Sequence, residues 1–138
     1  MKLARVLLQA EGVAVTAAAV WAYAAQTDAS WLLLAVLWLV PDVGLLGFLG
    51  GSRVGAVAYN VTHSALGPLA TIGLGVGMGS ELVLAIGLIW TTHVGIDRAV
   101  GYGLKSSWSA KHTHLQQLTD PQGAGGEGVG AGRAEVVA

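Results

Sequence analysis

Residues 88–105, LIWTTHVGIDRAVGYGLK, join the start of an apolar membrane helix to three ionisable side chains. The first half of the stretch is almost entirely apolar, yet His93, Asp97 and Arg98 follow one another within six residues. An ionisable group inside a bilayer costs about 2.5–3.5 kcal/mol even on the lenient insertion scale. The stretch therefore predicts a membrane helix that carries one wall of a polar site.

Outward from this stretch, the chain divides into long apolar runs separated by short polar joints. The runs cover about residues 4–25, 31–50, 54–79 and 82–104. Each has about the 20 residues that a helix needs to cross a bilayer. Because the joints are short, neighbouring helices must run antiparallel. We therefore expect an all-α fold, an integral membrane bundle of four antiparallel transmembrane helices over residues 1–105.

Composition agrees with a membrane protein and excludes several kinds of function. Of the 138 residues, 54% are hydrophobic and 11% charged, whereas soluble domains have about 25% charged residues. The net charge of −1 gives no reason to expect a nucleic-acid partner. The absence of cysteine excludes disulfides, thiolate catalysis and Cys-based metal sites. The partners expected from composition are membrane lipids, and a homo-oligomer stays open.

The basic residues predict the orientation of the chain. All basic residues near the ends of the expected segments fall on one side of the bundle, namely Lys2, Arg5, Arg53, Lys105 and Lys111. The joints on the other side carry only Asp28 and Glu81. By the positive-inside rule this places both termini in the cytoplasm of a multi-pass protein of the cell (inner) membrane. An alternative is a cleaved signal peptide ending near Ala22-Tyr23-Ala24, but Glu11 interrupts its apolar run and cleavage would leave an unbalanced bundle.

The C-terminal part of the chain differs from the rest. Residues 106–138 are polar and end in the Gly-rich run DPQGAGGEGVGAGRAEVVA. Such a composition is typical of disorder. We predict a polar, partly disordered cytoplasmic tail.

Polar residues in the four apolar runs share one depth. Counted from the nearest basic residue of the cytoplasmic side, they lie roughly 9–18 Å into the bilayer at about 1.5 Å per helical residue; the set consists of Glu11, Asp42, His63, His93 and Asp97. Scattered polar residues would not be expected at a common depth. The shared depth predicts one polar layer in the inner leaflet.

Helical spacing places these groups on facing sides. His93 and Asp97 are four residues apart and share a helix face, which Gly101 and Lys105 would continue. Asn60 and His63 are three apart and can face the same way. Two imidazoles and two carboxylates suit a divalent ion such as zinc, manganese or iron. We expect this ion to be bound by Asp42, His63, His93 and Asp97. Structural ion pairs, Asp97 with Arg98 or Asp42 with Arg53, are the rival interpretation.

Two further patterns concern packing. Gly73/Gly77 and Gly75/Gly79 form small-xxx-small pairs that are typical of close contact between membrane helices. Pro68 lacks an N–H and crowds the carbonyl four residues earlier, which predicts a kink in the third run.

At these residues the chain resembles a small bacterial membrane-protein family catalogued as domain of unknown function 4260. The stretches that carry the resemblance lie between about residues 6 and 115 and include QAEGVAVTAAAVWAYA, WLVPDVGLLGFLGGSRVGAVAYNVTHSALGPL and HVGIDRAVGYGLK. It implies an all-helical membrane protein and no established activity. Besides the polar layer, the matching positions include Tyr59, Asn60, Arg98, Tyr102, Lys105 and His114.

A weaker similarity concerns mechanism. The order of Pro41-Asp42, Thr62-His63 and the H-x-x-x-D pair of His93 is similar to that of membrane-bound metal-dependent hydrolases. That family usually has a fuller acidic motif where this chain has Val43-Gly44, and an Arg where it has Val61. These departures argue against a dinuclear site and leave a mononuclear one open.

Three functions compete on this basis. The first is a metal-dependent membrane hydrolase or acid/base enzyme on a lipid-like molecule, with Glu11 and Asp42 catalytic and a substrate-binding set of Tyr59, Asn60, Arg98, Tyr102 and Lys105. The second is a small proton-coupled transporter that uses Glu11. The third is an accessory structural membrane protein without chemistry.

Overall fold

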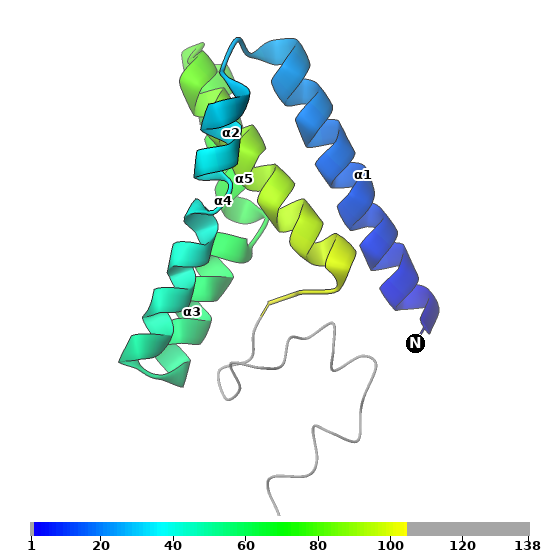
Figure 1. The fold of residues 1–138 in the computed structure, drawn as a ribbon, viewed down its shortest axis with the longest axis vertical. Helices are drawn as coiled ribbons and strands as arrows, with labels where there is room; N and C mark the ends of the chain where they lie inside the picture. Colours follow the sequence, from blue (N-terminus) through cyan, green and yellow to red (C-terminus); the bar gives the residue numbers. More distant parts are fainter. Residues whose placement is uncertain (1, 105–138) are drawn as a thin grey trace, which may run out of the picture.

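The computed structural model describes residues 2–104, whose regular structure is entirely helical (Figure 1). Three helical stretches are long and apolar enough to cross a membrane: Leu3–Gln26, Trp31–Gly50 and Glu81–Val100. The expected all-helical, membrane-spanning class is thereby confirmed. The cytoplasmic placement of both termini stays a prediction, and the expected tail, 106–138, lies outside the described residues.

Each expected run forms helix, but only two of the four are continuous. The first and last runs are the single helices α1 (Lys2–Gln26) and α5 (Glu81–Val100). The second run divides into α2 (Trp31–Leu37) and the 3-10 helix η1 (Val40–Gly50), and the third into α3 (Ser52–His63) and α4 (Leu66–Met78). One unbroken helix over 31–50 or over 54–79 is therefore a wrong expectation.

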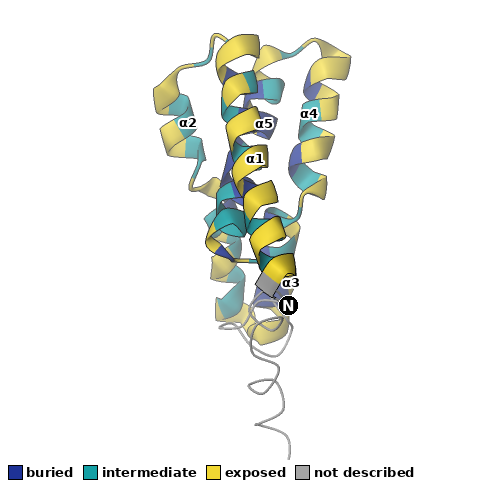
Figure 2. Cartoon of the chain, turned by 90° about the vertical axis from the view of Figure 1, so that its right-hand side faces the viewer, coloured by how far each residue is buried: buried dark blue, intermediate teal, exposed yellow. Residues whose placement is uncertain are grey.

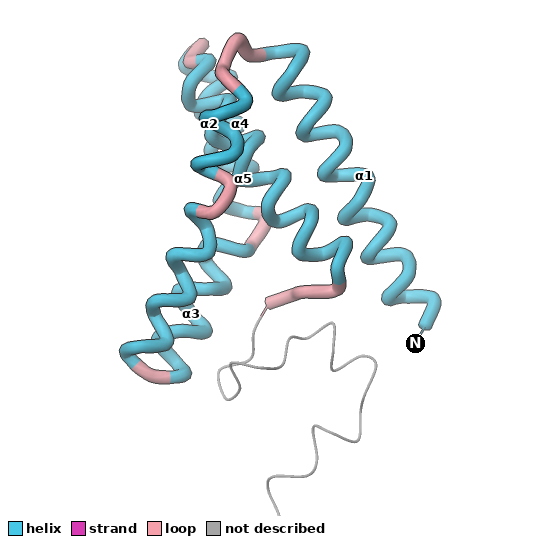
Figure 3. The backbone as a smooth tube through the Cα atoms, viewed as in Figure 1, coloured by secondary structure: helices cyan, strands magenta, loops and turns pink. Residues whose placement is uncertain are grey.

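Proline accounts for both interruptions. A proline has no N–H for the carbonyl four residues before it, and its ring clashes with that carbonyl in a continuous helix. Helix α2 ends at Leu37, four residues before Pro41. The backbone of Ser64, four residues before Pro68, is extended, with ψ 152°. The kink expected from Pro68 is thus a complete break, and the two breaks are the pink segments near mid-molecule in Figure 3.

The 3-10 geometry of η1 follows from a glycine repeat. Residues i and i+3 eclipse one another in a 3-10 helix, so Gly44, Gly47 and Gly50 form one straight stripe along η1. This stripe packs against α3: a methyl group added at Gly47 would lie 2.7 Å from the Ala58 Cβ. An α-helix would turn the three glycines progressively away from α3. The threefold spacing therefore permits a backbone contact that α-helical geometry would lose.

Helix α5 is the centre of the molecule, with α1 on one side and α4 on the other (Figures 1 and 2). It crosses α1 at Gly12, where an added methyl group would lie 2.7 Å from the Gly95 carbonyl oxygen. It approaches α4 where Gly75 meets Leu84, with an added methyl group 2.5 Å from the Leu84 nitrogen. A second contact with α4 lies at Gly87, where an added methyl group would lie 2.8 Å from the Ile72 nitrogen.

The glycines of α4 do not all serve packing as expected. Gly75 contacts α5, but nothing lies within 4 Å of a methyl group placed at Gly73 or Gly77. Gly79 ends α4 in the left-handed conformation, with φ 62°. Among the described residues, therefore, neither glycine of the Gly73/Gly77 pair mediates a close contact, and of the Gly75/Gly79 pair only Gly75 does.

Most large apolar side chains point outward, as expected of surfaces that face lipid. Figure 2 shows exposed residues along much of α1 and on the outer sides of α2 and α4. Leu49 is 88% exposed and Leu66 78% exposed. The small buried core instead joins Tyr23 of α1 to Ala85, Leu88 and Ile89 of α5. A solvent-exposed apolar surface around so small a core is the arrangement of a protein that sits in a bilayer.

Candidate metal centre

Two histidines from different helices face each other at the level of the helix breaks. His63 is the last residue of α3, and His93 lies in the middle of α5. Their Nε2 atoms are 3.2 Å apart, and the residues are only 4% and 2% exposed. The break before Pro68 ends α3 at His63, and this places the imidazole against α5.

Two carboxylates converge on the same pair of nitrogens. Asp42 Oδ1 lies 3.4 Å from His63 Nε2 and 3.6 Å from His93 Nε2. Asp97 Oδ2 lies 3.5 Å and 3.8 Å from the same two nitrogens. Asp42 is reached because Pro41 interrupts the second run immediately before it, while Asp97 lies one helical turn after His93 on α5. Asp42 is the more accessible, with a side chain 42% exposed against 20% for Asp97.

The hydrogen bonds of His63 determine which of its nitrogens is free. His63 Nδ1 lies 3.0 Å from the carbonyl oxygen of Tyr59, which can only accept. The Thr62 hydroxyl, 2.9 Å from the same nitrogen, has the Ala58 and Tyr59 carbonyls as acceptors for its own proton, so it too can accept from Nδ1. These contacts favour the proton on Nδ1, which leaves the lone pair of Nε2 toward His93 and the carboxylates. This tautomer, held by a backbone carbonyl, is typical of metal-ligating histidines.

His93 lacks a comparable partner. Its Nδ1 is buried and has no hydrogen-bond partner among the described residues. Its ring contacts Trp38 edge-on, with centroids 4.9 Å apart. Its Nε2 is the only ring nitrogen that meets polar groups, and those groups are the other three members of the cluster. Since Nδ1 of His93 meets no acceptor among residues 2–104, a neutral His93 can carry its proton on Nε2 and donate it to His63 Nε2, and a metal ion would take the place of that proton.

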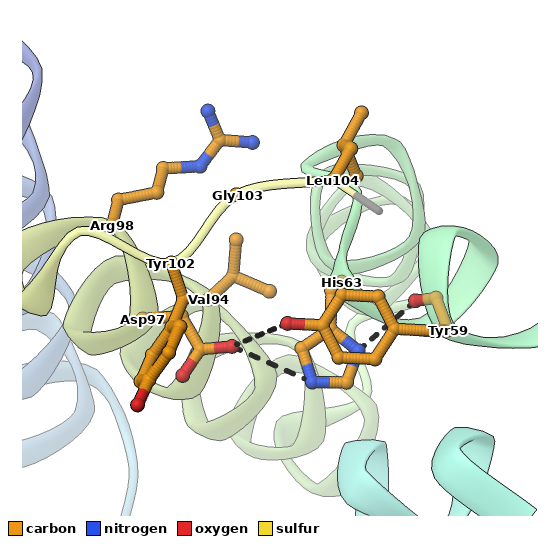
Figure 4. Close-up of a pocket in the computed structure, with 8 residues that line it drawn as sticks. All are labelled: Tyr59, His63, Val94, Asp97, Arg98, Tyr102, Gly103 and Leu104. Atoms are coloured by element: carbon orange, nitrogen blue, oxygen red, sulfur yellow. Dashed lines mark hydrogen bonds and ion pairs between the residues drawn. The ribbon is translucent and has the colours of Figure 1, made fainter. Parts of the chain in front are cut away.

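Tyr59 organises one side of the cluster. Its ring stacks on His63 with centroids 3.8 Å apart and planes 13° apart, and its hydroxyl lies 3.5 Å from Asp97 Oδ2. Figure 4 shows both contacts together with the bond from His63 to the Tyr59 carbonyl. One residue of α3 therefore orients an imidazole and, through its hydroxyl, a carboxylate of α5.

Trp90 supports the same region from α5. Its Nε1–H donates to the Thr62 carbonyl over 2.6 Å, and its ring lies against Gly67 at the start of α4. The break after His63 removes the helical donor that this carbonyl would otherwise have. Trp90 thus satisfies a carbonyl freed by the break and holds the end of α3 against α5.

The donor distances fit one divalent ion. Ligands about 2.0–2.1 Å from a tetrahedral zinc ion lie about 3.3–3.4 Å from one another. Asp42 Oδ1 lies 3.4 and 3.6 Å from the two imidazole nitrogens, which are themselves 3.2 Å apart. One donor atom each from Asp42, His63 and His93 lies within 4.8 Å of both others. Two imidazoles with carboxylate oxygens suit zinc, iron or manganese.

A pocket adjoins the cluster on the side of Asp97. It is lined by Tyr59, His63, Val94, Asp97, Arg98 and residues 102–104 (Figure 4). We call it the α5-end pocket, because α5 ends beside it. Gly101 has φ 93°, and the Tyr102 N–H donates to the Asp97 carbonyl over 2.7 Å, which closes the helix after Val100. Because the helix ends at Val100, the expected continuation of the His93–Asp97 face to Gly101 is wrong, and Lys105 lies outside the described residues.

The predicted site residues divide into three groups. The structure brings Asp42, His63 and His93 within reach of one ion, and it places the fourth expected ligand, Asp97, beside both histidines. Tyr59, Arg98 and Tyr102 line the adjoining pocket. Asn60 is half-buried on α3, next to Tyr59. Glu11 is exposed on α1 and, among residues 2–104, forms no hydrogen bond or ion pair with the cluster. Its catalytic role stays a prediction. Lys105 and His114 lie outside the described residues.

Sequence reasoning missed the residues that support the cluster. Trp38 and Trp90 read as ordinary apolar membrane residues, and no spacing rule relates either of them to a histidine on another element. The 3-10 helix carried a readable signal, the threefold repeat of glycine in GLLGFLG. The prolines were a second readable signal. Pro41 lies directly before Asp42 in one apolar run, and Pro68 lies shortly after His63 in the next.

Comparison with known proteins identifies the family. The model of the family described as domain of unknown function (DUF4260) matches residues 5–118. Since this covers most of the chain, the protein belongs to that family. No curated protein and no solved structure matches the chain.

Proposed function

We propose that this protein is a multi-pass protein of the bacterial inner membrane that binds one divalent transition-metal ion and uses it in hydrolysis of a lipid-like molecule. The observation that carries the proposal is the approach of two histidine Nε2 atoms to 3.2 Å with carboxylate oxygens on both sides. A divalent ion bound there would take the place of the proton that the two nitrogens otherwise share, and it would face carboxylate oxygens on both sides.

The ligands divide by their positions. His63, His93 and Asp42 form the three-ligand group, and two histidines with one carboxylate leave coordination positions for substrate. An ion held in this way acts as a Lewis acid and activates water. Asp97 is held by the Tyr59 hydroxyl and lines the pocket, so it accepts the proton of the attacking water.

The test is metal content. The protein purified in detergent is expected to contain about one zinc, iron or manganese ion per chain by elemental analysis, and His63→Ala and His93→Ala are expected to lose it. Asp28→Ala, which removes an exposed carboxylate from the joint after α1, serves as the control and should retain the metal. Absence of metal from the wild type, with its structure unchanged after chelation, would refute the proposal.

A second candidate, a small transporter, is favoured by one observation. Two of the four expected runs are interrupted next to the polar cluster, and broken helices at a central polar site are typical of secondary transporters. Substrate-dependent proton flux in liposomes that is lost in Glu11→Gln and kept in His63→Ala would favour transport. Absence of substrate-dependent proton flux in the wild type, together with bound metal, would favour the enzyme.

A further inference from the structure

The α5-end pocket contains a cationic group that the metal cluster does not use. Arg98 lies in the last turn of α5 and is half-buried. Its guanidinium forms no ion pair among residues 2–104, because the neighbouring Asp97 side chain points to the two histidines. Figure 4 shows the Arg98 side chain extending away from the Asp97 carboxylate.

The walls of the pocket differ in polarity. Val94 and Leu104 supply apolar surface, whereas Tyr59 and Tyr102 supply aromatic rings with hydroxyl groups. His63 and Asp97 form the side that belongs to the metal cluster. This lining suits an amphipathic ligand with an anionic group at Arg98.

The geometry of the arginine side chain limits which kinds of anion it binds well. A guanidinium presents a planar fork of donors that matches phosphate and carboxylate oxygens in pairs, and charge-assisted bonds of this kind are about twice as strong as neutral ones. Carboxylates already surround the cluster, so an approaching anion needs a separate positive partner. Arg98 is the arginine that lines the pocket, and Arg53 is exposed at the far end of α3.

We propose that the α5-end pocket binds the phosphate group of a lipid-like substrate, with Arg98 holding the phosphate beside Asp97 and His63. The proposal rests on the function proposed above, for which it names the substrate class. A phosphorylated lipid and a free phosphate offer the same group to Arg98, and the apolar wall at Val94 and Leu104 favours the lipid.

The test measures binding of dodecyl phosphate to the detergent-solubilised protein by isothermal titration calorimetry, with inorganic phosphate as a second titrant. Dodecyl phosphate is expected to bind more tightly than inorganic phosphate. Arg98→Gln is expected to weaken its binding about tenfold or more, as for loss of a charge-assisted hydrogen bond. The matched control Arg53→Gln removes an exposed arginine and is expected to bind as the wild type does.

Three results would overturn the inference: wild-type affinity in Arg98→Gln, equal weakening in both arginine variants, or no binding of either titrant to the wild type. Equal affinity for the two titrants would show a free-phosphate site and exclude the lipid source. A measurement on the wild type covers the case in which Arg98→Gln does not fold. Dodecyl phosphate is expected to protect Arg98, and not Arg53, from modification by phenylglyoxal, and unprotected Arg98 contradicts the site.

Metal content separates this inference from the proposed function. Arg98→Gln is expected to keep its metal, because among residues 2–104 Arg98 forms no hydrogen bond or ion pair with Asp42, His63 or His93. Dodecyl phosphate binding that depends on Arg98 in a protein without metal would leave the phosphate site standing and remove the metal enzyme. A metal-loaded protein that does not bind dodecyl phosphate would leave the proposed metal site standing and remove the phosphate site.

Discussion

His63 and His93 lie on separate helices, α3 and α5, and their Nε2 atoms are 3.2 Å apart. The Tyr59 carbonyl fixes the His63 proton on Nδ1, so a lone pair points at the opposite ring. This relationship is stable only with a proton or a metal ion between the two nitrogens. The carboxylate of Asp42 adds a third donor for a metal, and the carboxylate of Asp97 lies beside the same pair of nitrogens.

Metal is expected to stabilise the protein through this pair. After chelation, zinc at 100 times its dissociation constant should raise the free energy of unfolding by about 2.7 kcal/mol. The measurement is the Tm of the detergent-solubilised protein during a zinc titration. His93→Ala should show no rise, whereas Asp28→Ala should respond as the wild type does. An equal rise in His93→Ala would show that zinc acts elsewhere.

Tyr59→Phe separates the hydroxyl of Tyr59 from its ring. The variant loses the contact with Asp97 and keeps both the stacking on His63 and the backbone carbonyl. Metal affinity, measured by competition with a chelator, should fall by about tenfold, the lower end for outer-shell partners. Tyr59→Leu also removes the stacked ring and should fall further. Unchanged affinity in Tyr59→Phe would contradict the role assigned to the hydroxyl.

Trp90→Phe removes the indole N–H that caps the Thr62 carbonyl. Because the break leaves this carbonyl without a helical donor, the variant should lose about 1–3 kcal/mol of stability. The measurement is thermal unfolding in detergent. Trp21→Phe is the control, since Trp21 is 70% exposed on α1 and should change stability little. Equal losses in both variants would mean that the indole bond is not the cause.

Gly47→Ala tests the glycine stripe of η1. The new methyl group would lie 2.7 Å from the Ala58 Cβ and 3.2 Å from the Gly55 Cα, so η1 must move away from α3. Overpacking of this kind costs about 1–3 kcal/mol. Gly73→Ala is the matched control, because open space surrounds that position on α4 and alanine favours helix. A Gly47→Ala variant as stable as Gly73→Ala would contradict close packing along the stripe.

Much of the candidate site is readable from the sequence. His93 and Asp97 are one turn apart on one helix, and the period of the α-helix alone places them on one face. Asp42 and His63 follow from the cost of ionisable groups in apolar runs, which favours their meeting other polar groups. For Glu11 the role stays a prediction, because depth along α1 does not determine which face of α1 meets α5. Gly12 occupies that contact, and Glu11 beside it is exposed.

The sequence by itself therefore determined an apolar helical chain of membrane type and the four residues of its polar cluster, because periodicity and the cost of buried charge act locally. The tertiary structure decided what depends on neighbours. It set the tautomer of His63 through the Tyr59 carbonyl, the capping of Thr62 by Trp90, and the 3-10 path of η1 against α3. Those features arise where two elements meet, and each element's own sequence describes only one side of the contact.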